Sequence, residues 1–236
     1  MPKPPLISAS DELERSSVVA NNSMNRQRGL TGVNSYAREL GFDPLTRLAG
    51  RPAPSWLDLC SGEGRALREA AGALSSDAVL TAVDLVGPLV PGTPTPPVLE
   101  EIIASISSWA PSRTYDLITC VHGLHYIGDQ LGLVCRAASW LTPDGLFIAH
   151  FDPDSIRWAD GSPAGRAALS TLRAAGFRYS SRHHRLTLDG ARDIRLPFHY
   201  AGADPSAGPN YTGQPAVGSH YSQASSGVPL TETRVG

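Results

Sequence analysis

The residues best placed to do chemistry surround a short glycine-rich turn. Asp58 lies in a run of apolar residues, and Gly62 and Gly64 follow it before a segment of helical composition begins. Glycines at such positions let the backbone bend sharply and approach a ligand closely. Because open α/β sheets bind ligands beyond the carboxyl ends of their strands, this turn predicts a ligand site there. Asp84 ends the next apolar run and would lie at the same edge of the sheet.

The charges at this turn discriminate between ligands. A dinucleotide places its pyrophosphate on a helix N-terminus and favours G-x-G-x-x-G, whereas Leu67 occupies the position of the third glycine. Asp58 and Glu63 would also put two negative charges beside a phosphate. S-adenosylmethionine (SAM) instead carries a cationic amino group and a sulfonium, which suit a carboxylate, and its ribose diol suits Asp84. NAD uses an acid at that same place, so Asp84 alone does not separate the two ligands.

Two histidines follow the fourth apolar run as His122-x-x-His125. His122 comes directly after the expected strand, where the methyl group of SAM would lie, and neutral imidazole accepts a proton near pH 7. We therefore predict His122, and secondarily His125, as the base for an alcohol or amine acceptor. For His125, packing under the next helix with a backbone hydrogen bond is the competing interpretation. The H-x-x-H spacing also suits a metal, but no third carboxylate or Cys ligand accompanies it at useful spacing, so we predict no metal.

Short apolar runs alternate with helical segments and predict a parallel sheet with right-handed crossovers. The expected strands are 55–60, 79–84, 102–106, 115–121 and 146–151, and the expected helices are 35–40, 65–74, 129–141 and 163–175. Segments 179–188 and 193–200 are separated by only the residues 189–192, which is too short for a parallel crossover. We expect these two segments to form an antiparallel hairpin at the sheet edge.

The two ends of the chain look like additions to this core. We divide the chain into an N-terminal arm and helix (1–50, a candidate lid), a cofactor-binding domain (51–200) and an irregular Gly/Pro-rich tail (201–236). A helix is expected in the arm near residues 11–19. Residues 87–97 contain five prolines, so the crossover helix expected there is short or replaced by a loop.

Composition excludes several classes of partner. Lys and Arg total 20 against 22 Asp and Glu, and a net charge of −2 supplies no field to attract a polyanion. The three cysteines show no C-x-x-C spacing and are expected to be reduced thiols. With no signal-peptide pattern and no run of about 20 apolar residues, we expect a cytoplasmic protein that binds a small molecule, and neither nucleic acid nor membrane. The oligomeric state stays open.

Between about residues 56 and 200, the chain resembles the class I SAM-dependent methyltransferases. Their first motif, an acid followed by a glycine-rich turn, matches Asp58-x-x-x-Gly62-x-Gly64. Cys60 stands where the family often has a further glycine, and the acid of the second strand matches Asp84. The fourth motif of the family matches the segment that carries the two histidines.

This resemblance implies a doubly wound, mostly parallel seven-stranded α/β sheet of order 3-2-1-4-5-7-6, with an antiparallel C-terminal hairpin and SAM as cofactor. The residues expected to contact SAM are Asp58, Cys60, Gly62, Gly64, Asp84, Leu85, Ser105, Ile106, Cys120 and Val121. The family often has an acid after its third strand, where this chain has Ser105-Ile106, so adenine recognition would rely on backbone. Its substrate contacts come from added segments, which suggests Tyr36, Arg38, Tyr211 and Tyr221 here, with plain packing as the alternative. Tyr126 of the fourth motif is a further candidate for substrate binding.

Four other polar residues receive structural interpretations. Asp152 and Asp154 follow the fifth expected strand and would suit a metal-dependent catechol-type methyltransferase only with a matching Asn or Asp partner. We expect them to cap the next helix. His183 and His184 fall on an expected edge strand, where a solvated or cross-strand role is the simpler interpretation.

Three functions remain open at this point. The favoured one is methyl transfer from SAM to an O, N or C nucleophile of a small molecule. The N-terminal arm and the C-terminal tail favour a role in specialised metabolism. The second is a SAM-binding protein without methyl transfer, such as a scaffold or a SAM-assisted cyclase-like catalyst. The third, an NAD-dependent oxidoreductase, requires a pyrophosphate to tolerate Asp58 and Glu63.

Overall fold

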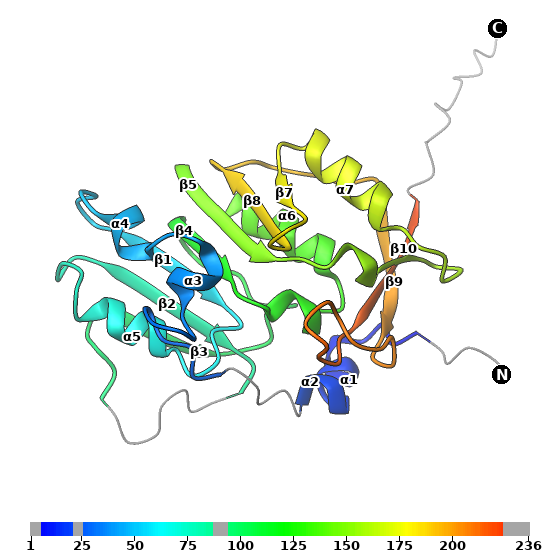
Figure 1. Ribbon diagram of the computed structural model, residues 1–236, viewed down its shortest axis with the longest axis horizontal. Coiled ribbons are helices and arrows are strands. Elements are labelled where there is room, and N and C mark those ends of the chain that lie inside the picture. Colours follow the sequence, from blue (N-terminus) through cyan, green and yellow to red (C-terminus); the bar gives the residue numbers. More distant parts are fainter. Residues whose placement is uncertain (1–5, 21–25, 87–93, 224–236) are drawn as a thin grey trace, which may run out of the picture.

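A seven-stranded sheet forms the centre of the protein, whose computed structural model describes residues 6–20, 26–86 and 94–223 (Figure 1). The strands lie in the order β3-β2-β1-β4-β5-β8-β7. Their bounds are β1 Ser55–Leu59, β2 Val79–Asp84, β3 Leu99–Ile103, β4 Tyr115–Cys120, β5 Leu141–His150, β7 Arg178–Ser180 and β8 Arg185–Asp189. Strands β1 to β5 pair in parallel, and β8 pairs antiparallel with both β5 and β7. Since β7 and β8 are the sixth and seventh strands of this sheet along the chain, the predicted order 3-2-1-4-5-7-6 is confirmed.

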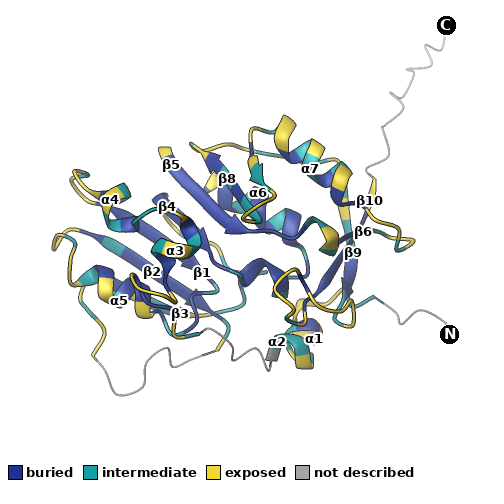
Figure 2. Ribbon diagram, viewed as in Figure 1, coloured by how far each residue is buried: buried dark blue, intermediate teal, exposed yellow. Residues whose placement is uncertain are grey.

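Helices cover both faces of this sheet. The helices α3 Tyr36–Leu40, α4 Pro44–Leu48 and α5 Arg65–Ala71 contribute to one buried apolar cluster, and α6 Gln130–Ser139 and α7 Gly165–Ala174 contribute to the other. Figure 2 shows the central strands as the most deeply buried part of the fold. All residues of β1 and β4 are buried, as expected for parallel strands packed on both faces.

Local signals explain where several helices begin and end. Ser35 caps α3 by accepting a hydrogen bond from the backbone N–H of Arg38, and Gly41 ends the helix at φ 79°. Asp43 caps α4 in the same way, with Pro44 as the first helical residue. The remaining expected elements agree with the structure to within a few residues, except that β5 begins at Leu141 and the third strand ends before Ser105.

The edge hairpin lies earlier in the chain than the sequence predicts. Segment 179–188, expected as one strand, contains parts of both β7 and β8, and the turn between them holds His183 and His184. This turn contains neither Gly nor Pro, so its sequence carries no signal of a chain reversal. Segment 193–200, expected as the partner strand, does not join this sheet.

A second, three-stranded sheet stands at one end of the molecule (Figure 1). It consists of β6 Ile156–Trp158, β10 Gly218–Gln223 and β9 Phe198–Asp204 in the order β6-β10-β9. The prediction of an irregular tail over 201–236 is therefore wrong for 201–204 and 218–223, whereas residues 205–217 form an irregular connection and 224–236 lie outside the described part. Tyr221 of β10 is buried, and its hydroxyl accepts from the N–H of Leu131 and donates to Asp129, each over 3.0 Å.

The N-terminal arm packs against this second sheet. The helix expected near 11–19 is broken into α1 Ser10–Glu14 and α2 Ser17–Ala20, and Leu13 is buried against Ala203 and Val217. Of the proline-rich segment, residues 87–93 lie outside the described part, and 94–98 contain no helix. Within the described ranges, no helix is long and apolar enough to cross a membrane.

Candidate active site

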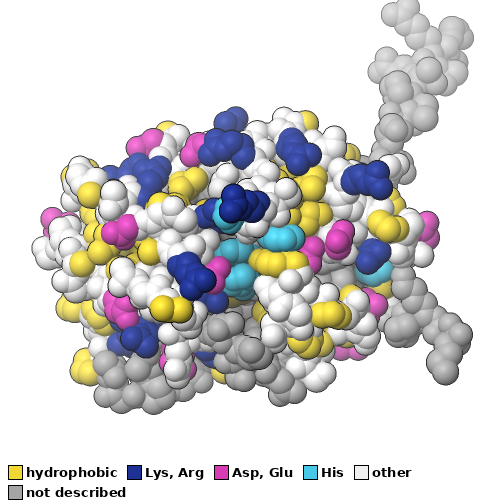
Figure 3. All heavy atoms as spheres, viewed as in Figure 1, with side chains coloured by type: hydrophobic (Ala, Val, Ile, Leu, Met, Phe, Trp, Pro, Cys, Tyr) yellow, Lys and Arg dark blue, Asp and Glu magenta, His cyan; other side chains and the backbone are white. Residues whose placement is uncertain are grey.

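A cavity of about 570 Å³ opens at the carboxyl ends of β1, β2, β4 and β5. This volume lies in the range of small-molecule sites. One wall is formed by the glycine turn after β1 together with Asp84, and we call it the glycine wall. The opposite wall carries His122, His125 and His150, and we call it the histidine wall. In Figure 3, histidine side chains gather near the centre of the molecular face, with basic side chains around them.

The backbone of the glycine turn is left-handed at Cys60 (φ 58°), Gly62 (φ 63°) and Gly64 (φ 66°). A Cβ atom on Gly62 would lie 2.7 Å from the carbonyl oxygen of Arg26, and that same oxygen accepts a hydrogen bond from the N–H of Glu63 over 2.9 Å. The close approach that requires glycine at position 62 is therefore made by the N-terminal segment, which lies across the turn. From the sequence alone, the close approach of a ligand is the expected reason for this glycine.

Asp58 lies beneath the cavity and is fully buried. Its carboxylate accepts hydrogen bonds from the hydroxyls of Tyr36 (2.5 Å) and Thr119 (2.6 Å). Burial disfavours the charged form and raises the pKa of Asp58 to about 7. Tyr36 lines the cavity, so the influence of Asp58 on a bound ligand passes through the Tyr36 hydroxyl.

Asp84 ends β2 at the cavity edge. Its two oxygens accept from the N–H groups of Gly62 (2.8 Å) and Val86 (3.0 Å), and the Arg26 guanidinium lies 3.2 Å away. A ribose diol at this carboxylate would compete with Arg26, whose side chain is partly exposed. Asp84 therefore already fixes the glycine turn before any ligand arrives.

A smaller pocket of about 70 Å³ adjoins the glycine wall and is lined by Leu85, Ile106, Tyr126 and, from α1, Leu13. Leu85 and Ile106 are two of the residues expected to contact the nucleoside. Ser105 is placed differently, because its hydroxyl donates to Glu14 of the N-terminal arm. The pocket thus has the apolar walls that an adenine ring requires.

The glycine wall contains one polar group without a partner. The hydroxyl of Ser61 is buried and forms no hydrogen bond within the described part of the chain, although Ser61 lines the cavity. Val121 and Cys60 line the same space, whereas the sulfur of Cys120 lies under Gly123. An unsatisfied buried hydroxyl, a left-handed glycine turn and a strand-end acid together fit a polar nucleoside such as SAM.

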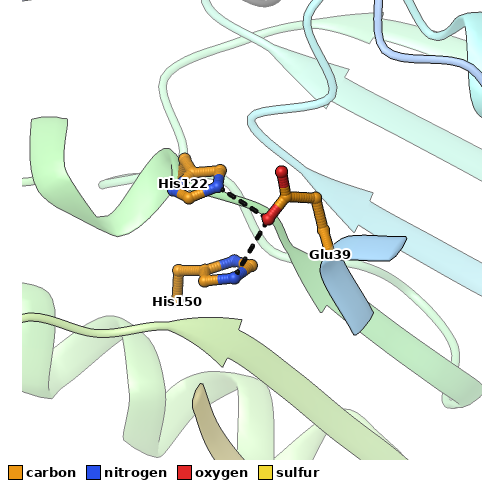
Figure 4. A group of neighbouring side chains, drawn as sticks. All are labelled: Glu39, His122 and His150. Atoms are coloured by element: carbon orange, nitrogen blue, oxygen red, sulfur yellow. Dashed lines mark hydrogen bonds and ion pairs between the residues drawn. The ribbon is translucent and has the colours of Figure 1, made fainter. Parts of the chain in front are cut away.

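The histidine wall is organised around Glu39 of α3 (Figure 4). Glu39 Oε2 lies 3.1 Å from His122 Nε2 and 3.5 Å from His150 Nε2. The two imidazole rings stack with their centroids 4.0 Å apart and their planes 10° apart. His122 has φ 59°, a conformation uncommon outside glycine and often found at functional sites.

The sequence did not identify Glu39 or His150 as site residues. Glu39 lies 83 residues before His122, so spacing gave no link between them. The prediction of no metal assumed that no carboxylate accompanies the H-x-x-H pair, and this premise fails in three dimensions. The position of His150 at the end of β5 was a usable signal, because β4 and β5 are parallel neighbours whose carboxyl ends meet.

His125 is buried on the histidine wall, and neither ring nitrogen has a hydrogen-bond partner among the residues that the structure describes. The backbone hydrogen bond expected for its ring is therefore wrong. Burial lowers the pKa of His125 to about 3, and burial likewise lowers that of His150 to about 2. The pKa of Glu39 is also lowered, to about 2, because its hydrogen bond with His122 stabilises the charged carboxylate. The Glu39 carboxylate thus faces the neutral, buried imidazole of His150.

Tyr211 reaches the same wall from the connection between β9 and β10. Its hydroxyl lies 3.3 Å from His122 Nδ1, and its ring stacks on His184 at 3.7 Å. Asp152 accepts hydrogen bonds from the N–H groups of Asp154 and Tyr211, so it caps the short 3-10 turn Pro153–Ser155 and holds this connection. The expectation that Asp152 and Asp154 cap the next helix is wrong, because Ala164 stands at the N-cap of α7.

Of the residues expected at the substrate, Tyr36, Arg38 and Tyr126 line the cavity and Tyr211 lies beside it. Tyr221 does not, because it is buried in the second sheet.

Residues 33–207 match a family model described as a methyltransferase domain. The match spans more than half of the chain, which belongs to this methyltransferase family. It is a class I SAM-dependent methyltransferase in fold, and its cofactor is SAM. No curated protein matches the sequence.

Several solved structures share parts of this architecture. CalS10, a SAM-bound amino pentose methyltransferase from Micromonospora echinaspora, is 19% identical over 44% of this chain and 46% of its own, with a TM-score of 0.36. DhpI with S-adenosylhomocysteine is 23% identical over 66% and 87%, with a TM-score of 0.44. The [4+2]-cyclase SpnF is 15% identical over 74% of both chains, with a TM-score of 0.47. The chain spans about half the length of CalS10 and of two further methyltransferases.

Proposed function

We propose that the protein transfers the methyl group of SAM to an O, N or C atom of a small molecule bound against His122. The observation that supports this is one cavity with two chemically different walls, a glycine wall suited to the cofactor and a histidine wall suited to an acceptor. SAM supplies a methyl group on a sulfonium, and the electron pair of the broken carbon–sulfur bond stays on sulfur. The chain must then place the acceptor and take up its proton.

His122 is the residue that we assign to proton uptake. Glu39 contacts Nε2 of its ring over 3.1 Å, which leaves Nδ1 to face the acceptor. A carboxylate on one nitrogen holds the ring orientation and stabilises the imidazolium that forms when the other nitrogen takes a proton. The Tyr211 hydroxyl now lies 3.3 Å from Nδ1, where an acceptor hydroxyl or amine would replace it. His125, which burial keeps neutral and whose ring nitrogens have no partner among the described residues, is the second candidate.

A small acceptor is supported by the size of the cavity and by the balanced charge of the chain. The cavity volume of about 570 Å³ must hold acceptor and cofactor groups together. A net charge of −2 offers no attraction to a nucleic acid. The arm and the β9–β10 connection, which border the cavity, are the parts that would define the acceptor, and we propose specialised metabolism as its source.

The test begins with calorimetric titration of SAM into the full chain, followed by radiolabelled SAM with a panel of small alcohols, phenols, amines and enols. We expect SAM binding and labelled product with at least one acceptor class. His122→Asn, chosen because Asn tolerates a positive φ, should lower methyl transfer by roughly 10²- to 10⁴-fold and leave SAM affinity unchanged. Exposed His199→Ala is the control and should change neither quantity.

Two results would contradict the proposal in different ways. Absence of SAM binding would remove the cofactor assignment. SAM binding with no label transferred to any acceptor class would instead identify a protein that uses SAM without methyl transfer, which was the second interpretation of the sequence.

A further inference from the structure

We propose that Glu39, His122 and His150 bind a divalent first-row transition metal of the zinc type. The three residues come from α3, from the end of β4 and from the last position of β5. One ligand atom from each lies within 4.8 Å of the others. Figure 4 shows both imidazole rings directed at the same carboxylate.

The separations between these atoms agree with metal coordination. Zinc binds imidazole nitrogen and carboxylate oxygen at about 2.0–2.1 Å, so two ligand atoms of a tetrahedral site lie about 3.3 Å apart. The Glu39 Oε2 atom is 3.1 Å from His122 Nε2 and 3.5 Å from His150 Nε2. The distances suit one ion, but each imidazole holds a metal near its own plane and the two rings lie only 10° from parallel, so one ring must rotate for both to share the ion.

The donor set favours a particular class of metal. Two imidazoles with one carboxylate and an open position form the ligand set of catalytic zinc sites and of several sites for neighbouring transition metals. Magnesium and calcium prefer oxygen ligands throughout. Arg28 lies 3.5 Å from the other oxygen of Glu39, Oε1, which leaves Oε2 as the coordinating atom.

The surroundings restrain the rings and leave one side open. The His150 side chain is only 5% exposed, and its Nδ1 has no hydrogen-bond partner in the described part of the chain. Burial restrains its orientation. The Tyr211 hydroxyl can accept a hydrogen bond from Nδ1 of His122, which is the second contact that metal-binding histidines usually make. The side that faces the cavity is free for a further ligand.

This inference deepens the proposed function and rests on it for one point only, the identity of that further ligand. In the metal-bound protein, an oxygen or nitrogen atom of the methyl acceptor would complete the coordination. His122 would hold the metal through Nε2 with its proton on Nδ1, so it would be a ligand and not the base, and the metal would supply the activation of the acceptor instead. Metal binding itself can be measured without any acceptor, so the two proposals can fail separately.

The experiment uses the full chain after treatment with a chelator. Zn²⁺ is titrated by calorimetry and by competition with a chromophoric chelator, and Co²⁺ is added to a second sample for its visible absorption spectrum. We expect one ion per chain and, with Co²⁺, the intense visible bands of a low-coordinate site with nitrogen and oxygen ligands.

Variants identify the ligands. Glu39→Gln keeps the size of a partly exposed side chain, and it should weaken Zn²⁺ binding by more than about 100-fold, beyond the effect usual for residues that only support a ligand. His150→Gln should do the same, and exposed His199→Ala should bind Zn²⁺ as the unmodified chain does. Thermal unfolding and SAM titration of each variant show whether it is folded.

The outcomes are distinct. Equal Zn²⁺ affinity in folded Glu39→Gln and the unmodified chain, or no stoichiometric binding at all, would overturn the metal site and leave His122 as the proposed base. Stoichiometric Zn²⁺ binding lost in the two ligand variants would establish the site even if no methyl acceptor were found.

Discussion

The glycine wall and the histidine wall differ in how far their polar groups are satisfied by the protein itself. On the glycine side, the carboxylates of Asp58 and Asp84 accept hydrogen bonds on all of their oxygens, and within the described ranges the Ser61 hydroxyl is the one buried side-chain group of this wall without a partner. On the other side, His125 and Nδ1 of His150 have none among the described residues. Since buried polar groups are nearly always paired, the first wall is preformed and the second is completed by what it binds.

The walls also differ in where their residues come from. The glycine wall is built largely from one continuous stretch, with Asp84 added from the neighbouring strand. The histidine wall combines Glu39, His122, His150 and Tyr211, which are widely separated in the sequence. A local motif specifies the first wall, whereas the second exists only after the chain has folded.

The largest effect on the glycine wall is expected from adding one carbon atom to Gly62. Gly62→Ala should lower the free energy of unfolding by about 2–5 kcal/mol and abolish measurable SAM binding, because the new Cβ meets the Arg26 carbonyl oxygen in a left-handed residue. Urea unfolding and SAM titration measure both effects. Gly50→Ala is the matched control, since Gly50 has φ 77° with no atom within 4 Å of an added Cβ. It should cost only about 1–2 kcal/mol. Equal losses in the two variants would show that the Arg26 contact does not matter.

A change of pH should separate Asp58 from other acids. Its folded pKa of about 7 exceeds the usual value of about 3.9, so the folded state keeps a proton that the unfolded state loses. This contribution to stability is complete below about pH 4 and disappears as the pH rises through 7. We expect the Tm advantage of the unmodified chain over Asp58→Asn to shrink by several degrees between pH 5 and pH 8. The Tm difference between the unmodified chain and the exposed control Asp77→Asn should stay constant over this pH range. A constant Tm difference for Asp58→Asn as well would refute the raised pKa of Asp58.

The smallest effect should come from Arg26, which competes for the oxygen of Asp84 that a ribose would use. Arg26→Ala should strengthen SAM binding by up to about 5-fold, since a partly exposed ion pair contributes at most about 1 kcal/mol. Arg38→Ala removes the same charge from the cavity, but the Arg38 side chain donates to the Val33 carbonyl and not to Asp84. Weaker binding in Arg26→Ala alone would mean that Arg26 contacts the cofactor.

Much of the fold could be predicted from the sequence because its signals are local. The order of the main sheet, the turn at Asp58–Gly64 and the role of Asp84 as a strand-end acid all follow from short patterns of apolar residues, glycines and acids. The second sheet was missed because β10 reads Gly-Ser-His-Tyr-Ser-Gln, a polar sequence in which Ser219 and His220 are nevertheless buried. Glu39 and Arg26 were missed because their partners are set by how the arm folds over the sheet.

The connection between β9 and β10 has a consequence for engineering. It is anchored at both ends in the small sheet, and it carries Tyr211 to His122 while forming no part of the seven-stranded sheet. Under the proposed function, grafting a different hairpin loop onto these two strands should alter acceptor choice, in the way that antibody frameworks receive new loops. The cofactor half of the molecule would need no redesign.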